Sequence, residues 1–169
     1  MIQKKILLFG KNGQVGQALR KELSSDYELT ALGREDVNLE NSKLVAQVIE
    51  DINPDFLINA AAYTKVDQAE DESDLAMKIN KIATEIMAKK TCELGIPMVY
   101  YSTDYVFDGA KDGPYVEDDK PNPISLYGVT KHQGEEAVRE NNPNHIILRT
   151  SWVFSSHGNN FVKTIVNFA

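Results

Sequence analysis

Five short apolar runs punctuate the chain, and stretches with a helical spacing of apolar residues separate them. The runs that we expect to form buried strands are residues 5–9, 27–32, 56–58, 98–101 and 145–148. Between them, apolar residues recur three or four positions apart, which is the spacing of one helix face. The helices predicted in this way cover residues 15–23, 44–49, 69–94 and 127–140.

This alternation of strand and helix predicts the fold class. Repeated strand–helix units are typical of an α/β protein with a parallel sheet, right-handed crossovers and helices on both faces. We therefore expect a doubly wound parallel sheet of Rossmann-like type. Residues 105–125 are rich in turn formers and charges, so we expect them to form a long surface loop.

The length and the C-terminus bear on domain organisation. A chain of 169 residues is close to the size of one domain. Phe161, Ile165 and Phe168 lie on one predicted helix face, yet the sequence stops at Ala169 without a capping residue. We expect residues 1–169 to be one domain that is truncated within a helix near 160–169. A frayed terminal helix that docks on a partner is the alternative.

Composition narrows the classes of function. There are 18 Lys+Arg against 25 Asp+Glu, and the net charge of −7 argues against nucleic acid as a partner, because such binding needs a basic surface. Cys92 is the single cysteine, which excludes a disulfide framework and a cysteine-rich metal site, and we assign no metal. No apolar run reaches the ~18 residues of a membrane span. The N-terminus does not resemble a signal peptide, so we expect a cytoplasmic protein without membrane contact.

The turn after the first strand carries Gly10, Gly13 and Gly16 at a regular spacing. Glycine lets the backbone approach a ligand closely, and the N-terminus of the helix that follows attracts anions. The turn therefore indicates a phosphate site, with a plain strand–helix turn as the alternative.

Two further strand ends bear on the ligand. Where an acidic residue at the end of the second strand would bind ribose hydroxyls, this chain has Gly33 and Arg34. Arg34 suits a 2′-phosphate and favours NADPH, although a solvated surface arginine fits the sequence equally well. The small residues at 59–62 would let a flat ligand lie across the edge of the sheet.

Tyr127 and Lys131 lie four positions apart at the start of a predicted helix, so both lie on one face. A nearby cation lowers the pKa of a phenol and makes it a better proton donor and acceptor at neutral pH. Ser102 and Thr103 end the fourth strand and point to opposite faces. The strand pattern leaves open which of these two hydroxyls faces the site.

Five motifs occur in a set order: the glycine turn, Asn59–Ala62, Ser102–Phe107, Tyr127-x-x-x-Lys131 and Arg149–Phe154. Together they resemble those of the extended short-chain dehydrogenases/reductases, and within that superfamily those of the dTDP-4-dehydrorhamnose reductases. The glycine turn and the Tyr–Lys pair belong to the wider superfamily. The stretches around Thr103 and Arg149 are much more specific, and the likeness covers nearly the whole chain.

The resemblance implies an NAD(P)H-dependent reduction of a 4-keto dTDP-sugar. Tyr127 would protonate the sugar oxygen, Lys131 would hold the nicotinamide ribose and lower the tyrosine pKa, and Thr103 would bind the carbonyl. The implied substrate residues are Thr103, Asp104 and Trp152. The implied cofactor residues are Gly10, Lys11, Asn12, Gly13, Gln14, Val15, Gly16, Arg34, Asn38, Leu39, Ala62, Tyr63, Thr64, Tyr101, Tyr127 and Lys131.

The chain departs from the family pattern in two respects. Asn38 stands where family members often have aspartate, which affects the adenine side of the cofactor site. The family also has a C-terminal region that completes the substrate pocket and carries dimer contacts, and we expect this chain to lack it. The cofactor implied is NADPH, with NADH as the alternative, and the implied assembly is a homodimer of the full-length protein.

Two other functions fit the same motifs. A sugar-nucleotide epimerase or dehydratase of the same superfamily would recycle a tightly held NAD instead of consuming NADPH. A non-catalytic module, similar to the regulatory subunit of methionine adenosyltransferase, would act by binding a partner. The intact Thr103, Tyr127 and Lys131 argue against a pure binding module, which has no need of a tuned phenol.

Overall fold

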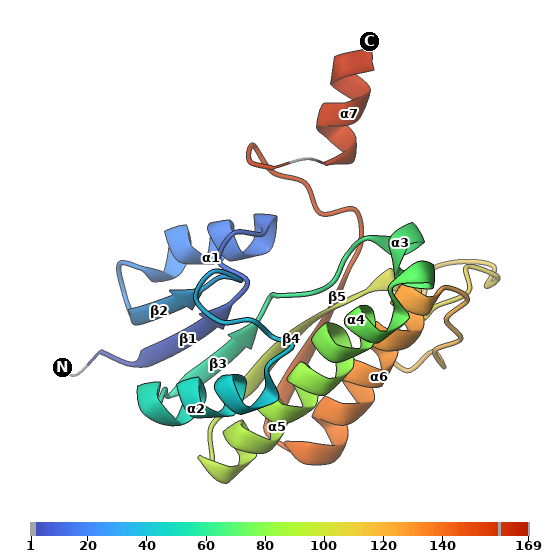
Figure 1. The fold of residues 1–169 in the computed structure, drawn as a ribbon. Helices are drawn as coiled ribbons and strands as arrows, with labels where there is room; N and C mark the ends of the chain where they lie inside the picture. Colours follow the sequence, from blue (N-terminus) through green and yellow to red (C-terminus); the bar gives the residue numbers. More distant parts are fainter. Residues whose placement is uncertain (1–2, 159, 169) are drawn as a thin grey trace.

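The computed structural model describes residues 3–158 and 160–168 and contains a sheet of parallel strands (Figure 1). The strands are β1 (Lys5–Phe9), β2 (Glu28–Leu32), β3 (Phe56–Asn59), β4 (Met98–Thr103) and β5 (His145–Thr150). Their order in the sheet is β2-β1-β3-β4-β5, and every neighbouring pair is parallel. The predicted Rossmann-like α/β fold is therefore confirmed.

Helices connect these strands and follow the last of them. The α-helices are α1 (Gln14–Leu23), α2 (Ser42–Ile52), α3 (Val66–Asp71), α4 (Ser73–Met77), α5 (Ala83–Glu93), α6 (Leu126–Asn141) and α7 (Phe161–Phe168). A π-helical turn, η1 (Lys78–Ile82), joins α4 to α5, and a 3-10 turn, η2 (Asp104–Val106), follows β4. Beyond η2, the predicted surface loop has no regular element up to α6.

The prediction of one continuous helix over residues 69–94 is wrong. The segment breaks at Glu72, whose backbone lies outside the helical region, and it widens to the π-helical turn around the buried Asn80. The apolar spacing does not reveal these breaks, because a π turn shifts the helix face by less than one residue in each turn. The side chain of Asn80 is satisfied by partners outside its own helix.

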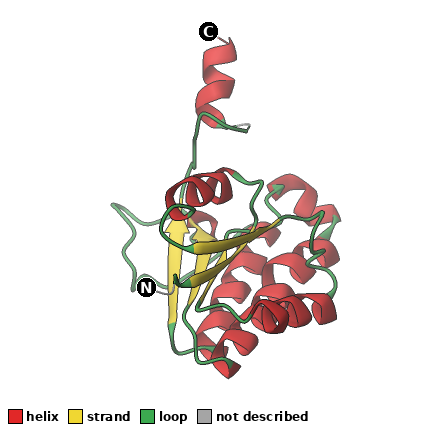
Figure 2. Cartoon of the chain, turned by 90° about the vertical axis from the view of Figure 1, so that its left-hand side faces the viewer, coloured by secondary structure: helices red, strands yellow, loops and turns green. Residues whose placement is uncertain are grey.

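Helices cover the two faces of the sheet unequally. Leu7, Phe9 and Leu57 are fully buried in the main core, together with residues of α2, α5 and α6. Figure 1 shows these three helices on one face of the sheet. On the opposite face, Ile6 and Leu8 form a smaller cluster with residues of α1. Figure 2 shows most of the helices on one side of the strands. The expected helices on both faces are present, with most of the helical mass on one side.

Strand β5 shows the same division. Ile147 faces the main core, and Arg149 points toward α6, whereas Ile146 and Leu148 face the other way and are exposed.

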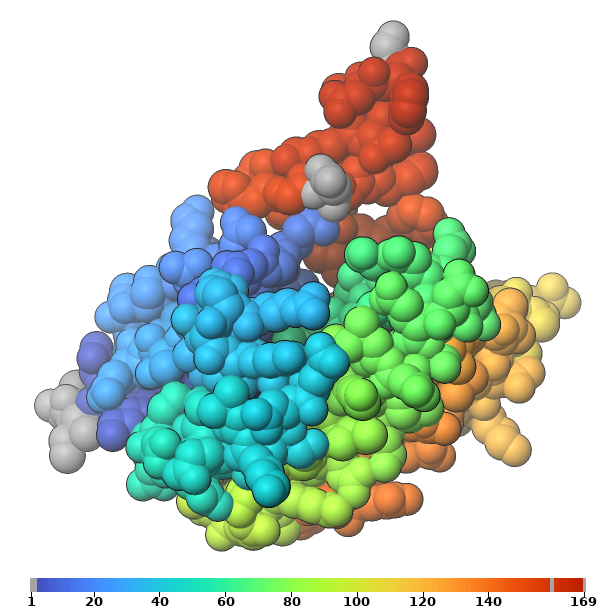
Figure 3. Space-filling model, in the orientation of Figure 1, coloured from blue at the N-terminus to red at the C-terminus, as the bar shows by residue number. Residues whose placement is uncertain are grey.

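The segment after β5 leads to α7, which projects from the rest of the molecule; Figure 3 shows the projection in space-filling form. No side chain of α7 is buried in the described residues, and Ala169 lies outside them. Of the described helices, none is both long and apolar enough to span a membrane.

Close packing of α6 on its neighbours depends on Gly134. A Cβ atom at this position would lie 2.5 Å from the Asn80 carbonyl oxygen and 2.5 Å from the Tyr100 hydroxyl. Both atoms are buried, and the carbonyl belongs to the backbone, so neither can move away easily. Gly134 thus sets the distance between α6, β4 and η1.

We predict that Gly134→Ala lowers the free energy of unfolding by about 1–3 kcal/mol, the usual range for overpacking. Alanine in an unconstrained helix interior would instead stabilise the protein by about 1 kcal/mol. Chemical denaturation measures the difference, with Glu136→Ala on the exposed side of α6 as the control. A variant as stable as the unmodified protein would contradict this packing.

Candidate active site

Most of the predicted functional residues lie at the carboxyl edge of the sheet, where parallel α/β folds bind ligands. The glycine turn follows β1, Arg34 follows β2, residues 60–64 follow β3, and Thr103 ends β4. Tyr127 and Lys131 reach the same edge from the first turns of α6.

The glycine turn has the geometry of an anion site. Gly10 has a φ of 94°, and a Cβ there would collide with the backbone of residues 60 and 61. Gly16 on α1 packs directly against the Gly10 backbone. Gly13 precedes α1, and no side chain caps the first N–H groups of that helix. These groups fit the pyrophosphate of a dinucleotide, which would accept their hydrogen bonds.

Charged residues flank the glycine turn. The Lys11 Nζ atom lies 2.5 Å from Asp36 and 3.1 Å from Glu35, and these hydrogen bonds raise the pKa of Lys11. Asp36 also accepts a hydrogen bond from the Gly33 amide, which lowers the pKa of its carboxyl group. Arg34 has one distant partner, Glu40 at 3.7 Å, and its side chain is 78% exposed. Of these two cations, Arg34 is therefore the one available to a ligand.

A groove of about 420 Å³ runs along the strand ends from the glycine turn. It contains most of the predicted cofactor residues, namely Gly10, Asn12, Gly13, Arg34, Asn38, Leu39, Ala62, Tyr63 and Thr64. Leu75 and Ile79 add apolar lining from α4 and η1, which the sequence analysis did not anticipate. Val15 and Gly16 lie in α1, and Tyr101 is partly buried on β4.

Lys11 and Gln14 face a second hollow of about 840 Å³, lined by α1, β2 and residues 155–157. The Gln14 amide donates to the Val153 carbonyl oxygen at 3.3 Å and accepts a hydrogen bond from Asn160 at 3.0 Å. Gln14 thus ties α1 to the segment that follows β5, in addition to any contact with a cofactor.

Tyr127 is 8% exposed and has the Tyr105 ring edge-on at 5.5 Å. Burial raises the pKa of its phenol, although the hydroxyl of Thr103 partly offsets this effect. The Thr103 hydroxyl accepts a hydrogen bond from the Tyr105 amide and also lies near the Tyr127 phenol. The lowering of the Tyr127 pKa by Lys131 stays a prediction, since in this structure the Lys131 ammonium donates its hydrogen bond to the Tyr101 carbonyl oxygen.

The ammonium of Lys131 points into the protein. It donates to the Tyr101 carbonyl oxygen at 2.7 Å and lies 4.0 Å from the centre of the Tyr100 ring. Lys131 is 1% exposed, and burial lowers its pKa to about 7 while the nearby Glu135 carboxylate raises it.

The sequence analysis missed Asn80, which joins the cofactor groove to α6. Its side chain accepts a hydrogen bond from the Tyr63 amide at 2.8 Å. It also donates hydrogen bonds to the Tyr63 carbonyl oxygen and to the Thr130 hydroxyl. Tyr63 and Tyr127 also share one apolar cluster. The sequence signal for Asn80 is a single asparagine between Ile79 and Ile82, two residues of the predicted apolar helix face.

Of the predicted substrate residues, Thr103 and Asp104 lie together, and Trp152 lies apart from them. Asp104 accepts a hydrogen bond from the Ser151 hydroxyl at 2.6 Å, close to Thr103. Trp152 is 69% exposed, and its ring contacts Phe161 of α7 edge-on instead of the groove. Of the described residues, no group of three or more His, Cys, Asp or Glu could hold a metal ion.

A parallel sheet of this order, with a glycine turn before α1 and a buried tyrosine and lysine on α6, defines an α/β protein of the Rossmann-like class. Residues 4–169 match the RmlD substrate binding domain family, and the chain belongs to that family.

Known proteins support this assignment. The chain is 46% identical over 165 residues to a dTDP-4-dehydrorhamnose reductase of Sinorhizobium fredii, covering 98% of this chain and 56% of that protein. A Salmonella typhimurium protein of the same name is also 46% identical, with 97% and 56% covered. The crystal structure of a Bacillus anthracis dTDP-4-dehydrorhamnose reductase in complex with NADP is similar, with a TM-score of 0.94 and 40% identity over 99% of this chain and 60% of that one. The chain thus spans a little over half the length of these relatives.

We predict that Arg34→Ala weakens NADPH binding roughly tenfold or more and NADH binding much less, because only NADPH carries a 2′-phosphate for charge-assisted hydrogen bonds. Dissociation constants from fluorescence titration with each cofactor measure the effect. Arg20→Ala, an arginine outside the groove, is the matched control. Equal losses for both cofactors would refute the role of Arg34.

Proposed function

We propose that the protein reduces the 4-keto group of a dTDP-sugar, dTDP-4-dehydro-L-rhamnose, with NADPH. The observation that carries this proposal is the buried Tyr127 phenol beside Thr103 and one helical turn from Lys131, next to a groove with a phosphate-binding turn. The relatives named as reductases, and the one in complex with NADP, support both the reaction and the cofactor.

The residues divide the work of binding. A bound NADPH would supply the hydride for C4 of the sugar. The turn from Gly10 to Gly16 would hold its pyrophosphate, and Arg34 its 2′-phosphate. Leu39 and Ile79 would cover the adenine side of the groove. Lys131 lies under the carboxyl end of β4, where the nicotinamide ribose would pass.

Tyr127 acts as the proton donor in this proposal. Its raised pKa keeps the phenol protonated at neutral pH, which is the form that reduction of a ketone requires. Thr103 would donate a hydrogen bond to the sugar carbonyl oxygen and hold it next to the phenol. As the oxygen gains negative charge, the proton passes to it from Tyr127, and the positive charge of Lys131 stabilises the phenolate left behind.

The substrate contacts extend beyond the described groove. We assign Asp104 and Trp152 to the sugar nucleotide, and the exposed Trp152 ring has the flat apolar surface that a base or sugar would stack on. A homodimer and a cytoplasmic location complete the proposal, on the strength of the family resemblance and the lone Cys92.

A coupled assay tests the reaction. The full-length protein receives dTDP-4-dehydro-6-deoxy-L-mannose, and nicotinamide absorbance is followed with NADPH and with NADH. The proposal requires consumption of reduced cofactor in step with formation of dTDP-L-rhamnose. Stoichiometric NAD in the purified protein and no consumption of NADPH would indicate an epimerase or dehydratase instead.

In the same assay, we predict that Tyr127→Phe lowers kcat by at least ~100-fold, the usual effect of losing a positioned acid. NADPH binding should stay nearly unchanged, because the variant keeps the aromatic ring and the groove. Tyr27→Phe, directly before β2 at the amino end of the sheet, is the control. Near-normal turnover of Tyr127→Phe would remove the proposed proton donor.

A further inference from the structure

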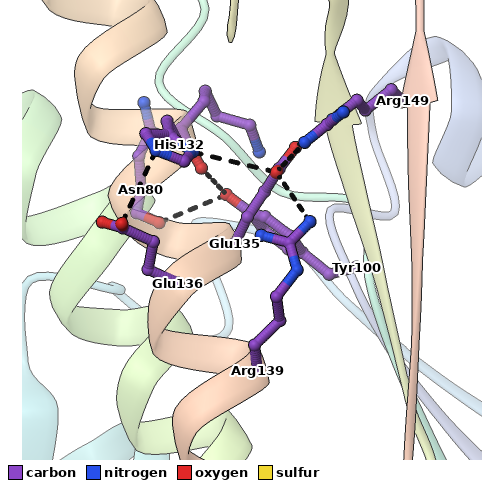
Figure 4. Close-up of polar contacts among 8 residues, drawn as sticks. Asn80, Tyr100, His132, Glu135, Glu136, Arg139 and Arg149 are labelled. Atoms are coloured by element: carbon purple, nitrogen blue, oxygen red, sulfur yellow. Dashed lines mark hydrogen bonds and ion pairs between the residues drawn. The ribbon is translucent and has the colours of Figure 1, made fainter. Parts of the chain in front are cut away.

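A second cluster of charges lies inside the protein, one helical turn beyond the Tyr–Lys pair. Glu135 on α6 is completely buried and accepts two hydrogen bonds from Arg149 of β5, at 2.8 and 2.6 Å (Figure 4). Arg139 donates a third at 3.1 Å from the next turn of α6. The two arginines thus hold the carboxylate in one orientation from two elements.

Tyr127, Lys131 and Glu135 are spaced by four residues, so they lie along one face of α6. The Lys131 ammonium contacts the Tyr101 carbonyl oxygen and the Tyr100 ring, which carry no net charge. Glu135 is the ionised group one helical turn from Lys131 on this face, and both side chains are buried, so its negative charge raises the Lys131 pKa.

Burial and charge oppose each other at both residues. Burial favours a neutral Lys131 and brings its pKa to about 7, and the Glu135 carboxylate limits this fall. Burial also favours a neutral Glu135, but Arg149 and Arg139 outweigh it and lower the pKa of the carboxyl group. The arginines therefore keep Glu135 negative, and a negative Glu135 helps to keep Lys131 positive.

The groups that face this pair come from each neighbouring element. Helix α6 contributes Tyr127, Arg139 and His132, which lies 3.9 Å from Glu135. Strand β4 contributes the Tyr100 ring and the Tyr101 carbonyl group, and β5 contributes Arg149. The η1 turn contributes the Asn80 carbonyl group, which the Tyr100 hydroxyl approaches. Among these described residues, Glu135 is the one that carries a carboxylate.

A purely structural role does not account for Glu135 well. Replacing a buried ion pair by apolar side chains of similar size is often neutral or stabilising, so the pair is weak evidence of a stability function. Its position next to a buried lysine is better explained by electrostatics.

We propose that Glu135 is a positioning residue of this site, which keeps the buried Lys131 ammonium charged and is itself held ionised by Arg149. The inference rests on the proposed reductase function, in which a charged Lys131 stabilises the Tyr127 phenolate. It adds to that function a control of the pH range in which the enzyme works.

Two readouts on the full-length protein test the proposal. NMR titration of ¹³C-labelled lysine follows the Lys131 side chain, which Lys131→Met identifies by loss of its signal. The second readout is the pH profile of kcat for ketosugar reduction. In Glu135→Gln, which keeps shape but loses charge, the Lys131 pKa should fall by about one pH unit or more. The loss of activity on the alkaline side should move to lower pH with it.

Two further variants separate charge from packing. Glu135→Asp keeps the carboxylate and should retain most of the Lys131 pKa even if it is less stable. Arg139→Gln removes a partly exposed positive charge from Glu135, so the Lys131 pKa should stay or rise. An unchanged Lys131 pKa in Glu135→Gln, or equal effects of Gln and Asp, would overturn the proposal. If the unmodified protein does not reduce the ketosugar, the proposed function fails, and the titration still decides whether Glu135 controls the charge of Lys131.

Discussion

The packing of α6 against β4 is the contact on which the site depends. Gly128 and Gly134 have no side chains and let the helix approach the Tyr105 backbone and the Tyr100 ring. At this short distance the lysine and the glutamate of α6 cannot reach water, so their charges must be balanced inside the protein. Arg149 on β5 provides that balance from the neighbouring strand. The tyrosine and lysine proposed for catalysis and the charges around Glu135 are thus parts of one buried arrangement.

The same packing joins the two halves of the site. Asn80 occupies the π-helical turn and bonds both to Tyr63, which lines the groove, and to Thr130 on α6. A regular α-helix through residues 78–82 would direct this side chain differently, so the irregular turn has a clear structural consequence. The groove and the phenol are held in fixed relation by groups that need not touch the reacting atoms.

The sequence predicts the strands well because each is a short apolar run bounded by turns or helical patterns, which is typical of a parallel sheet. The glycine turn and Arg34 also lie where their positions after β1 and β2 suggest. The pattern could not choose between Ser102 and Thr103, since that choice depends on the side from which α6 packs. It missed Asn80 and Glu135, whose partners are distant in sequence. Trp152 lies away from the groove because its contact is with α7, not with the sheet.

A crystal structure of the full-length protein with NADP⁺ tests the account most directly. The pyrophosphate should lie on the turn from Gly10 to Gly16. The nicotinamide ribose should lie within hydrogen-bond distance, about 3 Å, of Tyr127 and Lys131. A dinucleotide bound in the hollow beside Arg20 and His157, or a nicotinamide remote from Tyr127, would contradict the assignment of this edge of the sheet as the reaction centre.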